Sequence, residues 1–246
     1  MSGQEDVLRE KKTSLYQGKA LVLHQAAVKK LLRILPHKNF IPLHGYNPET
    51  HETLSPHYED LHNLFLPEGE KSAVSPRETL SILRDCLNGA LFLEDHGLVL
   101  QDIKLENLGY VTQDSRGRLI QGGKKVGVLF DLEGIYPIGA DLHDRYFTWL
   151  YVPPELHIKP IPSVQSSEMV YQFGVCLFEI FIQIQASLSV PVYEALAALY
   201  QDMLYYDPTN PHPRQGRIGL AEAIARLDLA MKKMRIDQAK SAATNP

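Results

Sequence analysis

A long amphipathic helix with a defined start and end constrains the fold more than any other stretch of this sequence. Apolar residues recur at helical spacing from about Arg77 to Asp95, which predicts one buried face. Ser75, followed three residues later by Glu78, forms a capping-box pattern, and Gly97 ends the helix. The residues expected on the buried face are Leu80, Leu83, Leu87, Ala90, Leu91 and Leu93.

Shorter elements flank this helix and predict a mixed chain. Upstream, residues 20–35 have helical periodicity until Pro36, and short strands are expected at residues 40–46 and 53–58. Downstream, two apolar pieces at residues 108–111 and 126–130 enclose a polar loop, which predicts a hairpin. After Pro162 the pattern is helical to near Lys240. We therefore expect an α+β fold in two unequal lobes.

The last expected helix runs from Leu220 to Met234 and has a basic end. Lys232, Lys233 and Arg235 lie there. Cations are favourable beside the negative end of a helix dipole, so this placement needs no ligand to explain it.

Several short segments occur together in a fixed order. Residues 95–108 contain Asp102, Lys104 and Asn107, and residues 128–134 contain Asp131. Thr-Trp-Leu-Tyr-Val-Pro-Pro-Glu follows at residues 148–155, then an apolar helix at 171–180 and an Asp-Pro turn at 203–208. In sequence, they resemble the catalytic loop, the Asp-Phe-Gly segment, the end of the activation segment, the central helix and the late turn of eukaryotic-type protein kinases. The resemblance covers roughly residues 28–230.

This resemblance implies a two-lobed kinase-like fold with a reduced N-lobe sheet and a mainly helical C-lobe. The N-lobe would comprise residues 1–58, the C-lobe residues 59–240, and a flexible tail residues 241–246. The cofactors implied are ATP and Mg²⁺. Asp102 would be the catalytic base and Lys104 would act on the transferred phosphoryl group, while Lys104, Asn107 and Asp131 would bind the nucleotide and Asn107 and Asp131 the metal.

The N-terminal part departs from the kinase pattern. The first 27 residues contain only Gly3 and Gly18, so there is no Gly-rich loop to cover the phosphates. Lys11 and Lys12 could supply a phosphate-contacting lysine, but a solvated charge run is the favoured interpretation. Val28 occupies the position of the C-helix glutamate, which predicts that the usual Lys–Glu ion pair is missing.

The C-terminal part departs at fewer positions. Leu100 and Gln101 replace the His and Arg that precede the catalytic aspartate, so activation by phosphorylation of the following segment is not expected. Met169, with Glu168 beside it, replaces the aspartate at the start of the central helix. Because Leu100 and Met169 are both apolar, we expect them to form a contact that replaces a buried hydrogen bond. Glu133 replaces the glycine of the Asp-Phe-Gly triplet.

Two side chains near the end of the activation segment carry structural hypotheses. Glu155 is expected to pair with Arg214 or Arg217. Trp149 belongs to an aromatic patch that either docks a partner or packs beneath the substrate platform.

Three functions compete. The first is an atypical Ser/Thr protein kinase, because Lys104 and Thr148 match that subclass and the four candidate site residues survive. The second is a pseudokinase, a binding module that regulates a protein partner by contact, because the Gly-rich loop and the Lys–Glu pair are missing. A third is that a partner chain supplies the missing N-lobe strands at an uncovered sheet edge.

Composition excludes some alternatives. The net charge is -4, which gives no electrostatic case for nucleic acid. The most apolar run, Phe173 to Ile184, is shorter than the roughly 20 residues that span a bilayer, so we expect a buried helix and no membrane span. The N-terminus does not resemble a secretory signal, and we expect a cytoplasmic protein. Cys86 and Cys176 are expected to be buried thiols. His51, His57 and His62 are expected in a polar loop without zinc.

Overall fold

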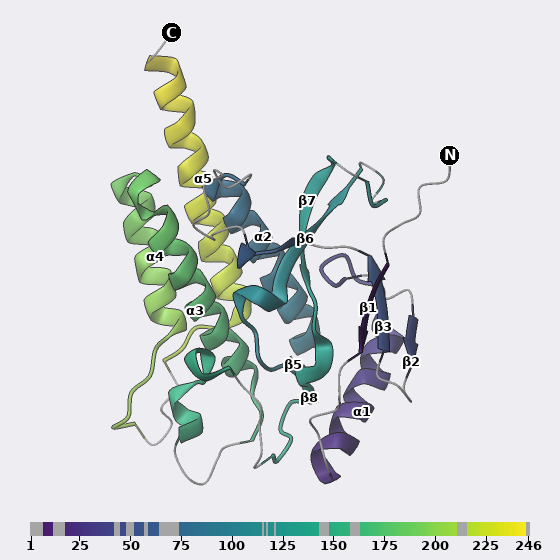
Figure 1. Ribbon diagram of the computed structural model, residues 1–246. Helices are drawn as coiled ribbons and strands as arrows, with labels where there is room; N and C mark the ends of the chain where they lie inside the picture. Colours follow the sequence, from purple (N-terminus) through teal and green to yellow (C-terminus); the bar gives the residue numbers. More distant parts are fainter. Residues whose placement is uncertain are drawn as a thin grey trace, which may run out of the picture.

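The computed structural model places helix α2 (Pro76–Asp95) between a group of C-terminal helices and a group of N-terminal elements (Figure 1). The N-terminal group contains α1 (Gly18–Ile34) and three strands that lie beside it in Figure 1. The structure is mixed α+β, as predicted. It describes residues 7–11, 18–41, 45–47, 52–56, 59–63, 74–114, 116, 118–120, 122–142, 148–157, 163–210 and 216–244.

Helix α2 begins and buries its apolar face as the sequence predicts. The Ser75 hydroxyl accepts a hydrogen bond from the Glu78 backbone N–H at 3.3 Å, and the Glu78 carboxylate accepts one from the Ser75 N–H at 3.0 Å. This reciprocal capping box satisfies two backbone donors that a helix start leaves unpaired. The fully buried apolar residues on the inner face are Leu80, Ile82, Leu83, Cys86, Leu87, Ala90 and Leu93.

Eight short strands in the described part of the chain form three small antiparallel sheets. They are β1 (Val7–Lys11), β2 (Gly45–Asn47), β3 (Glu52–Pro56), β4 (Glu59–Asp60), β5 (Leu98–Leu100), β6 (Leu108–Gln113), β7 (Lys124–Leu129) and β8 (Ile135–Pro137). The strand orders are β1-β3-β2, β4-β6-β7 and β5-β8. The predicted hairpin is therefore confirmed as β6 and β7, which pair with Leu108 opposite Leu129.

The predicted strand at residues 40–46 is only partly correct. Phe40 forms an isolated bridge to Leu129, and the strand itself, β2, begins at Gly45 and continues to Asn47. The buried Phe40 is flanked by two backbone hydrogen bonds to the end of β7, from the Ile41 N–H to the Leu129 carbonyl at 3.1 Å and from the Leu129 N–H to the Asn39 carbonyl at 2.9 Å. The segment therefore contacts the edge of the hairpin sheet at a single point and does not continue along it as a strand.

Three helices follow residue 162, as predicted: α3 (Ser166–Ile184), α4 (Val190–Met203) and α5 (Leu220–Thr244). The predicted end of α5 at Met234 is wrong, because the helix continues to Thr244. Residues after Met234 include several with high helix propensity, such as Gln238, Ala239 and Lys240. Lys232 and Arg235 consequently lie inside the helix and not at its C-terminus.

Helix α3 forms the apolar centre of the C-terminal group. Its residues Phe173, Cys176 and Ile180 are completely buried. Ser166–Ser187 is the one stretch among the described residues that could cross a membrane by length and composition. Its mean hydropathy is 1.4 and 56% of it is buried inside the protein, a property that the core helix of a soluble protein shares.

Both cysteines are buried free thiols, as predicted. Burial raises the pKa of the Cys86 thiol and of the Cys176 thiol well above the ordinary value. Each thiol therefore stays protonated at neutral pH and behaves as a small apolar side chain.

A buried ion pair joins the segment after residue 148 to the start of α5. Arg217 donates two hydrogen bonds to the Glu155 carboxylate, at 2.7 and 3.0 Å, and both side chains are almost fully buried. Arg217 also donates to the Ser167 carbonyl at 2.9 Å, so it links three segments. Arg217 is thus confirmed as a partner of Glu155, whereas Arg214, the other partner expected, lies outside the described residues.

Replacement of Arg217 should destabilise the protein strongly. In Arg217→Met the Glu155 carboxylate stays buried without its cation, and we expect the free energy of unfolding to fall by about 3–5 kcal/mol. Urea denaturation followed by circular dichroism measures this loss. The control is Arg226→Met, because Arg226 pairs with Asp202 at 2.7 Å on a half-exposed surface, where a pair contributes about 0–1 kcal/mol. Equal losses in the two variants would contradict the structural role of the Glu155–Arg217 pair.

Candidate functional site

The chain leaves strand β5 through a fixed turn that presents Asp102. All three residues of β5 are buried, and the next residue, Gln101, donates its N–H to the Gly134 carbonyl at 2.7 Å. One residue beyond Asp102, the buried Ile103 donates its N–H to the Gln172 side chain of α3 at 3.3 Å. These two backbone bonds hold the loop on both sides of the aspartate.

Asp102 and Asp131 share an unusual backbone conformation. Their φ angles are 61° and 58°, and among the described residues no other non-glycine residue has a positive φ. This left-handed region is uncommon for residues with a Cβ atom and costs roughly 1–3 kcal/mol at each position. Two of the four candidate site residues therefore hold a conformation that is otherwise found only at glycines in the described part of the chain.

Lys104 connects Asp102 to the segment that begins at Thr148. Its ammonium group lies 3.2 Å from the Asp102 carboxylate and 3.0 Å from the Thr148 hydroxyl. The Thr148 N–H donates to the other Asp102 oxygen at 2.5 Å. All three groups are partly exposed, so a carboxylate, an ammonium and a hydroxyl meet at a surface that solvent and a ligand can reach.

Asn107 and Asp131 lie at the same end of the β6–β7 hairpin. Leu108 pairs with Leu129, and in the next step the Phe130 N–H donates to the Asn107 carbonyl at 3.4 Å. Asp131 follows immediately. The Asn107 side-chain amide donates to the Asp102 carbonyl at 2.9 Å, which ties this end of the hairpin to the loop carrying Asp102.

The structure thus brings the four candidate site residues to one region. Asp102 contacts Lys104 through its side chain and Asn107 through its backbone carbonyl. Asp131 lies beside Asn107 through the strand register. The region combines two carboxylates, one ammonium and one amide oxygen, which suits a ligand containing both phosphate and a divalent cation.

A second layer of side chains supports the loop from α3. Leu100 and Met169 are both buried, and the Leu100 N–H points to the Met169 sulfur at 3.4 Å, which confirms the contact expected between them. Beside it, the Gln101 amide donates to the Glu168 carboxylate at 3.2 Å in a buried environment. Compared with positions 100 and 169, where the kinase resemblance places a polar contact, this one lies one residue later in the first segment and one residue earlier in the second.

The sequence analysis missed the roles of Gln101, Glu168 and Gln172. A signal was present, because Glu168 and Gln172 are four residues apart and thus share a face of an otherwise apolar helix. Both are completely buried. A pair of polar residues on the buried face of a helix predicts hydrogen bonds to something packed against it.

The short 3-10 helix Trp149–Tyr151 connects the site to α3. The Tyr151 hydroxyl donates to the Glu179 carboxylate at 2.6 Å, and the Tyr151 ring is buried. Burial raises the pKa of the Tyr151 hydroxyl and also the pKa of the Glu179 carboxyl. Trp149 is 77% exposed and contacts only the edge of the His157 ring among the described aromatic residues. Of the two residues, Tyr151 anchors the segment and Trp149 faces solvent.

Two candidate features from the sequence remain outside this region. Val28 of α1 is half-buried against the core. Helix α1 contacts β8 through His24, whose Nδ1 lies 3.3 Å from the Ile135 carbonyl.

The histidines near residue 60 are also separate from the site. His62 lies 3.6 Å from Glu106, whereas His51 and His57 are outside the described residues. Within the described residues, no group of three or more His, Cys, Asp or Glu side chains could hold a metal ion. The side chains of Lys11 and Lys12 are also outside the described part.

No protein-family model matches this chain, and no curated protein sequence matches it either.

Stability should depend on pH through Glu179. A raised pKa means that the folded state favours the protonated carboxyl, so this contribution is complete below the ordinary value of 4.5 and is lost as the pH rises through the folded pKa. Glu179→Gln keeps an acceptor for Tyr151 and cannot ionise. We expect the melting temperature of this variant, relative to wild type, to increase between pH 4 and pH 7.

The control for this prediction is Glu194→Gln, which alters an exposed glutamate on α4. Scanning calorimetry across the pH range should show no comparable trend for that variant. A Glu179→Gln curve parallel to wild type at all pH values would refute the role of the half-buried Glu179 carboxyl.

Proposed function

We propose that this chain is a protein-kinase-like domain that binds Mg-ATP and transfers a phosphoryl group to serine or threonine of a protein substrate. The observation that carries the proposal is the strained backbone of Asp102 and Asp131, the two carboxylates to which the kinase resemblance assigns chemistry. Left-handed aspartates persist only where the surrounding structure over-determines them, and such positions cluster at functional sites.

Each residue would have a role in phosphotransfer that follows from its chemistry. Asp102 would orient the substrate hydroxyl and accept its proton. Lys104 would stabilise negative charge that develops on the transferred group, and its bond to Thr148 keeps the ammonium at the mouth of the site. Asn107 and Asp131 would hold Mg²⁺, which would supply positive charge to offset that of the nucleotide phosphates.

The donor set fits the metal. Mg²⁺ prefers oxygen ligands and usually takes one or two from the protein. The hydrogen bond from the Asn107 amide nitrogen to Asp102 leaves the amide oxygen to face a cation, and the Asp131 carboxylate follows at the same end of the hairpin. Asn107 and Asp131 would therefore hold the ion.

A second candidate function is a pseudokinase that regulates a protein partner by contact. The position of the C-helix glutamate is occupied by Val28, which packs against the core and offers no carboxylate for a phosphate-binding lysine. Poor positioning of the nucleotide can reduce turnover about 100-fold or more. A partner that completes the N-terminal sheet would fit strands β1 and β2, which in the described residues pair only with β3.

Nucleotide binding should depend on Asp131. At an ATP concentration one hundred times Kd, Mg-ATP should stabilise the wild type by about 2.7 kcal/mol, and the Tm should rise accordingly. Asp131→Asn should lose the Mg-dependent part of this shift. The control, Asp95→Asn, makes the same change at an exposed position at the end of α2 and should keep the full shift. No Mg-dependent shift in the wild type would refute nucleotide binding at this site.

Phosphotransfer should depend on Asp102. With a generic protein substrate and radiolabelled Mg-ATP, Asp102→Asn should reduce the rate by roughly 10²–10⁴-fold while nucleotide binding persists. Retained turnover in this variant would contradict the assigned base. A wild type that binds Mg-ATP without turnover would favour the pseudokinase.

A further inference from the structure

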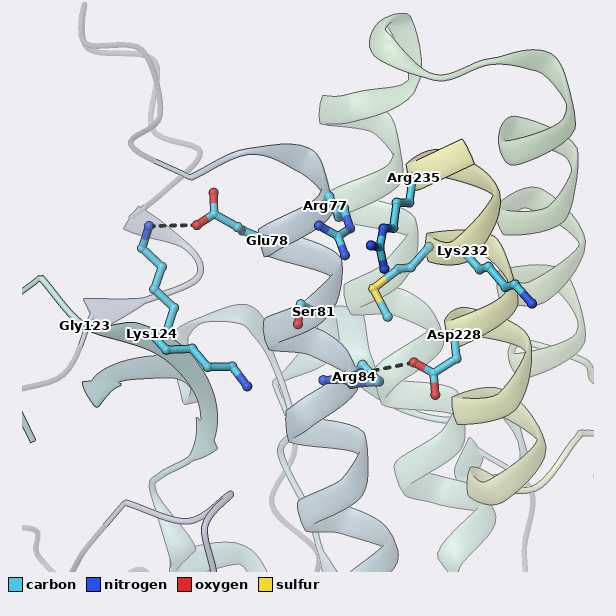
Figure 2. A pocket seen from close by; sticks show the side chains of 11 residues that line it. Arg77, Glu78, Ser81, Arg84, Gly123, Lys124, Asp228, Lys232 and Arg235 are labelled. Atoms are coloured by element: carbon cyan, nitrogen blue, oxygen red, sulfur yellow. Dashed lines mark hydrogen bonds and ion pairs between the residues drawn. The ribbon is translucent and has the colours of Figure 1, made fainter. Parts of the chain in front are cut away.

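A basic groove lies between α2, α5 and the start of β7, and its lining includes none of the four candidate site residues. Its volume is about 490 Å³. Figure 2 shows Arg77 of α2 and Arg235 of α5 pointing toward the space between the two helices, with Lys124 extending toward α2 from the hairpin. The cations that line the groove are Arg77, Arg84, Lys124, Lys125, Lys232 and Arg235.

The charges in this groove are unbalanced. The described residues that line it include six cations and two carboxylates, although the whole chain has a net charge of -4. Lys125 pairs with Glu78 at 3.3 Å and Arg84 with Asp228 at 3.2 Å, so both carboxylates are engaged. Within the described part of the chain, no carboxylate forms an ion pair with the other four, which are Arg77, Lys124, Lys232 and Arg235.

Helix stability does not account for these positions. Lys232 and Arg235 lie well inside α5, which ends at Thr244, so they gain little from the helix dipole, whose effect is confined to the last turn. Arg77 lies in the first turn of α2, where a cation is unfavourable. Arg77 and Arg235 occupy positions that helix stability does not favour, and both point toward the space between α2 and α5, which indicates a site that an anion would stabilise.

The shape and lining of the groove restrict the class of anion that it can bind. Its volume is within the range of small-molecule sites, and its concavity does not match a flat membrane surface. Among the described residues that line it, none is aromatic, so they offer no stacking platform for a nucleic-acid base. Two arginines can each bind a phosphate through paired hydrogen bonds, whereas lysines act as point charges.

We propose that this groove binds a compact small molecule that carries several phosphate groups. Arg77 and Arg235 bind phosphates from opposite helices, and Lys124 adds positive charge from the hairpin side. This site is separate from the one containing Asp102 and Asp131, and it uses neither Mg²⁺ nor those carboxylates.

The test uses inositol hexakisphosphate as probe and isothermal titration calorimetry at physiological salt. The full chain should bind one molecule, and the double variant Arg77→Gln/Arg235→Gln should weaken binding by roughly 10–100-fold, because charge-assisted hydrogen bonds are lost. The matched control is Lys30→Gln/Arg33→Gln, which removes two charges from exposed positions on α1. This control should change the affinity by less than about twofold.

Two further measurements separate the outcomes. Asp131→Asn should leave binding of the probe unchanged, so that failure here is distinct from failure of the nucleotide site. Sedimentation with phosphatidylcholine vesicles, with and without phosphatidylinositol bisphosphate, distinguishes a lipid headgroup from a free phosphorylated molecule as the source of the ligand. The proposal would be overturned if the chain bound neither free inositol hexakisphosphate nor the phosphatidylinositol bisphosphate vesicles. It would also be overturned if the groove variant and the control variant lost the same affinity.

Discussion

The backbone of β7 passes directly against the backbone of α2 at Gly127, and the position of the candidate site depends on this approach. A Cβ atom at Gly127 would lie 2.2 Å from the Ile82 carbonyl, which is far inside contact distance. The Gly127 N–H donates to the buried Asp85 at 3.2 Å, and its carbonyl accepts from the Asn39 amide at 2.9 Å. Glycine is required here because nothing larger lets the strand settle on the helix. The end of β7 that leads to Asp131 is thereby fixed relative to α2, and α2 in turn leads through β5 to Asp102.

The loop carrying Asp102 is held against α3 by buried side chains. The Leu100 N–H points to the Met169 sulfur, and beside it the Gln101 amide donates to the Glu168 carboxylate. Beyond the aspartate, the Ile103 N–H donates to the Gln172 side chain of the same helix. Helix α3 therefore fixes the loop on both sides of Asp102.

Local signals made much of the fold predictable from the sequence. The Ser75–Glu78 capping box and the apolar face of α2 are encoded within a few residues, and so is the β6–β7 hairpin, whose strands flank one polar loop.

Contacts between segments distant in sequence were harder to predict, because no local pattern encodes them. The sequence left Arg214 and Arg217 open as partners of Glu155, because the burial of Arg217 beside Glu155 depends on tertiary packing that no local pattern encodes. The short strand β5 was not expected, because three apolar residues have no measurable period and their pairing with β8 is set by the tertiary structure. The length of α5 was underestimated because its last turns depend on helix propensity without a periodic apolar face.

The candidate phosphotransfer site and the basic groove lie at opposite ends of the same strand. β7 begins at Lys124, beside the groove, and ends at Leu129, two residues before Asp131. A strand of this length spans about 20 Å, well beyond the Debye length of about 8 Å at physiological salt, so direct electrostatic interaction between the two sites is weak. Mechanical coupling would require a segment with two alternative arrangements. The strand is instead anchored midway, at Gly127, by two buried hydrogen bonds and by close backbone packing on α2. A rigid element of this kind holds both sites in place without passing a change from one to the other, and ligands at the two sites should therefore bind independently.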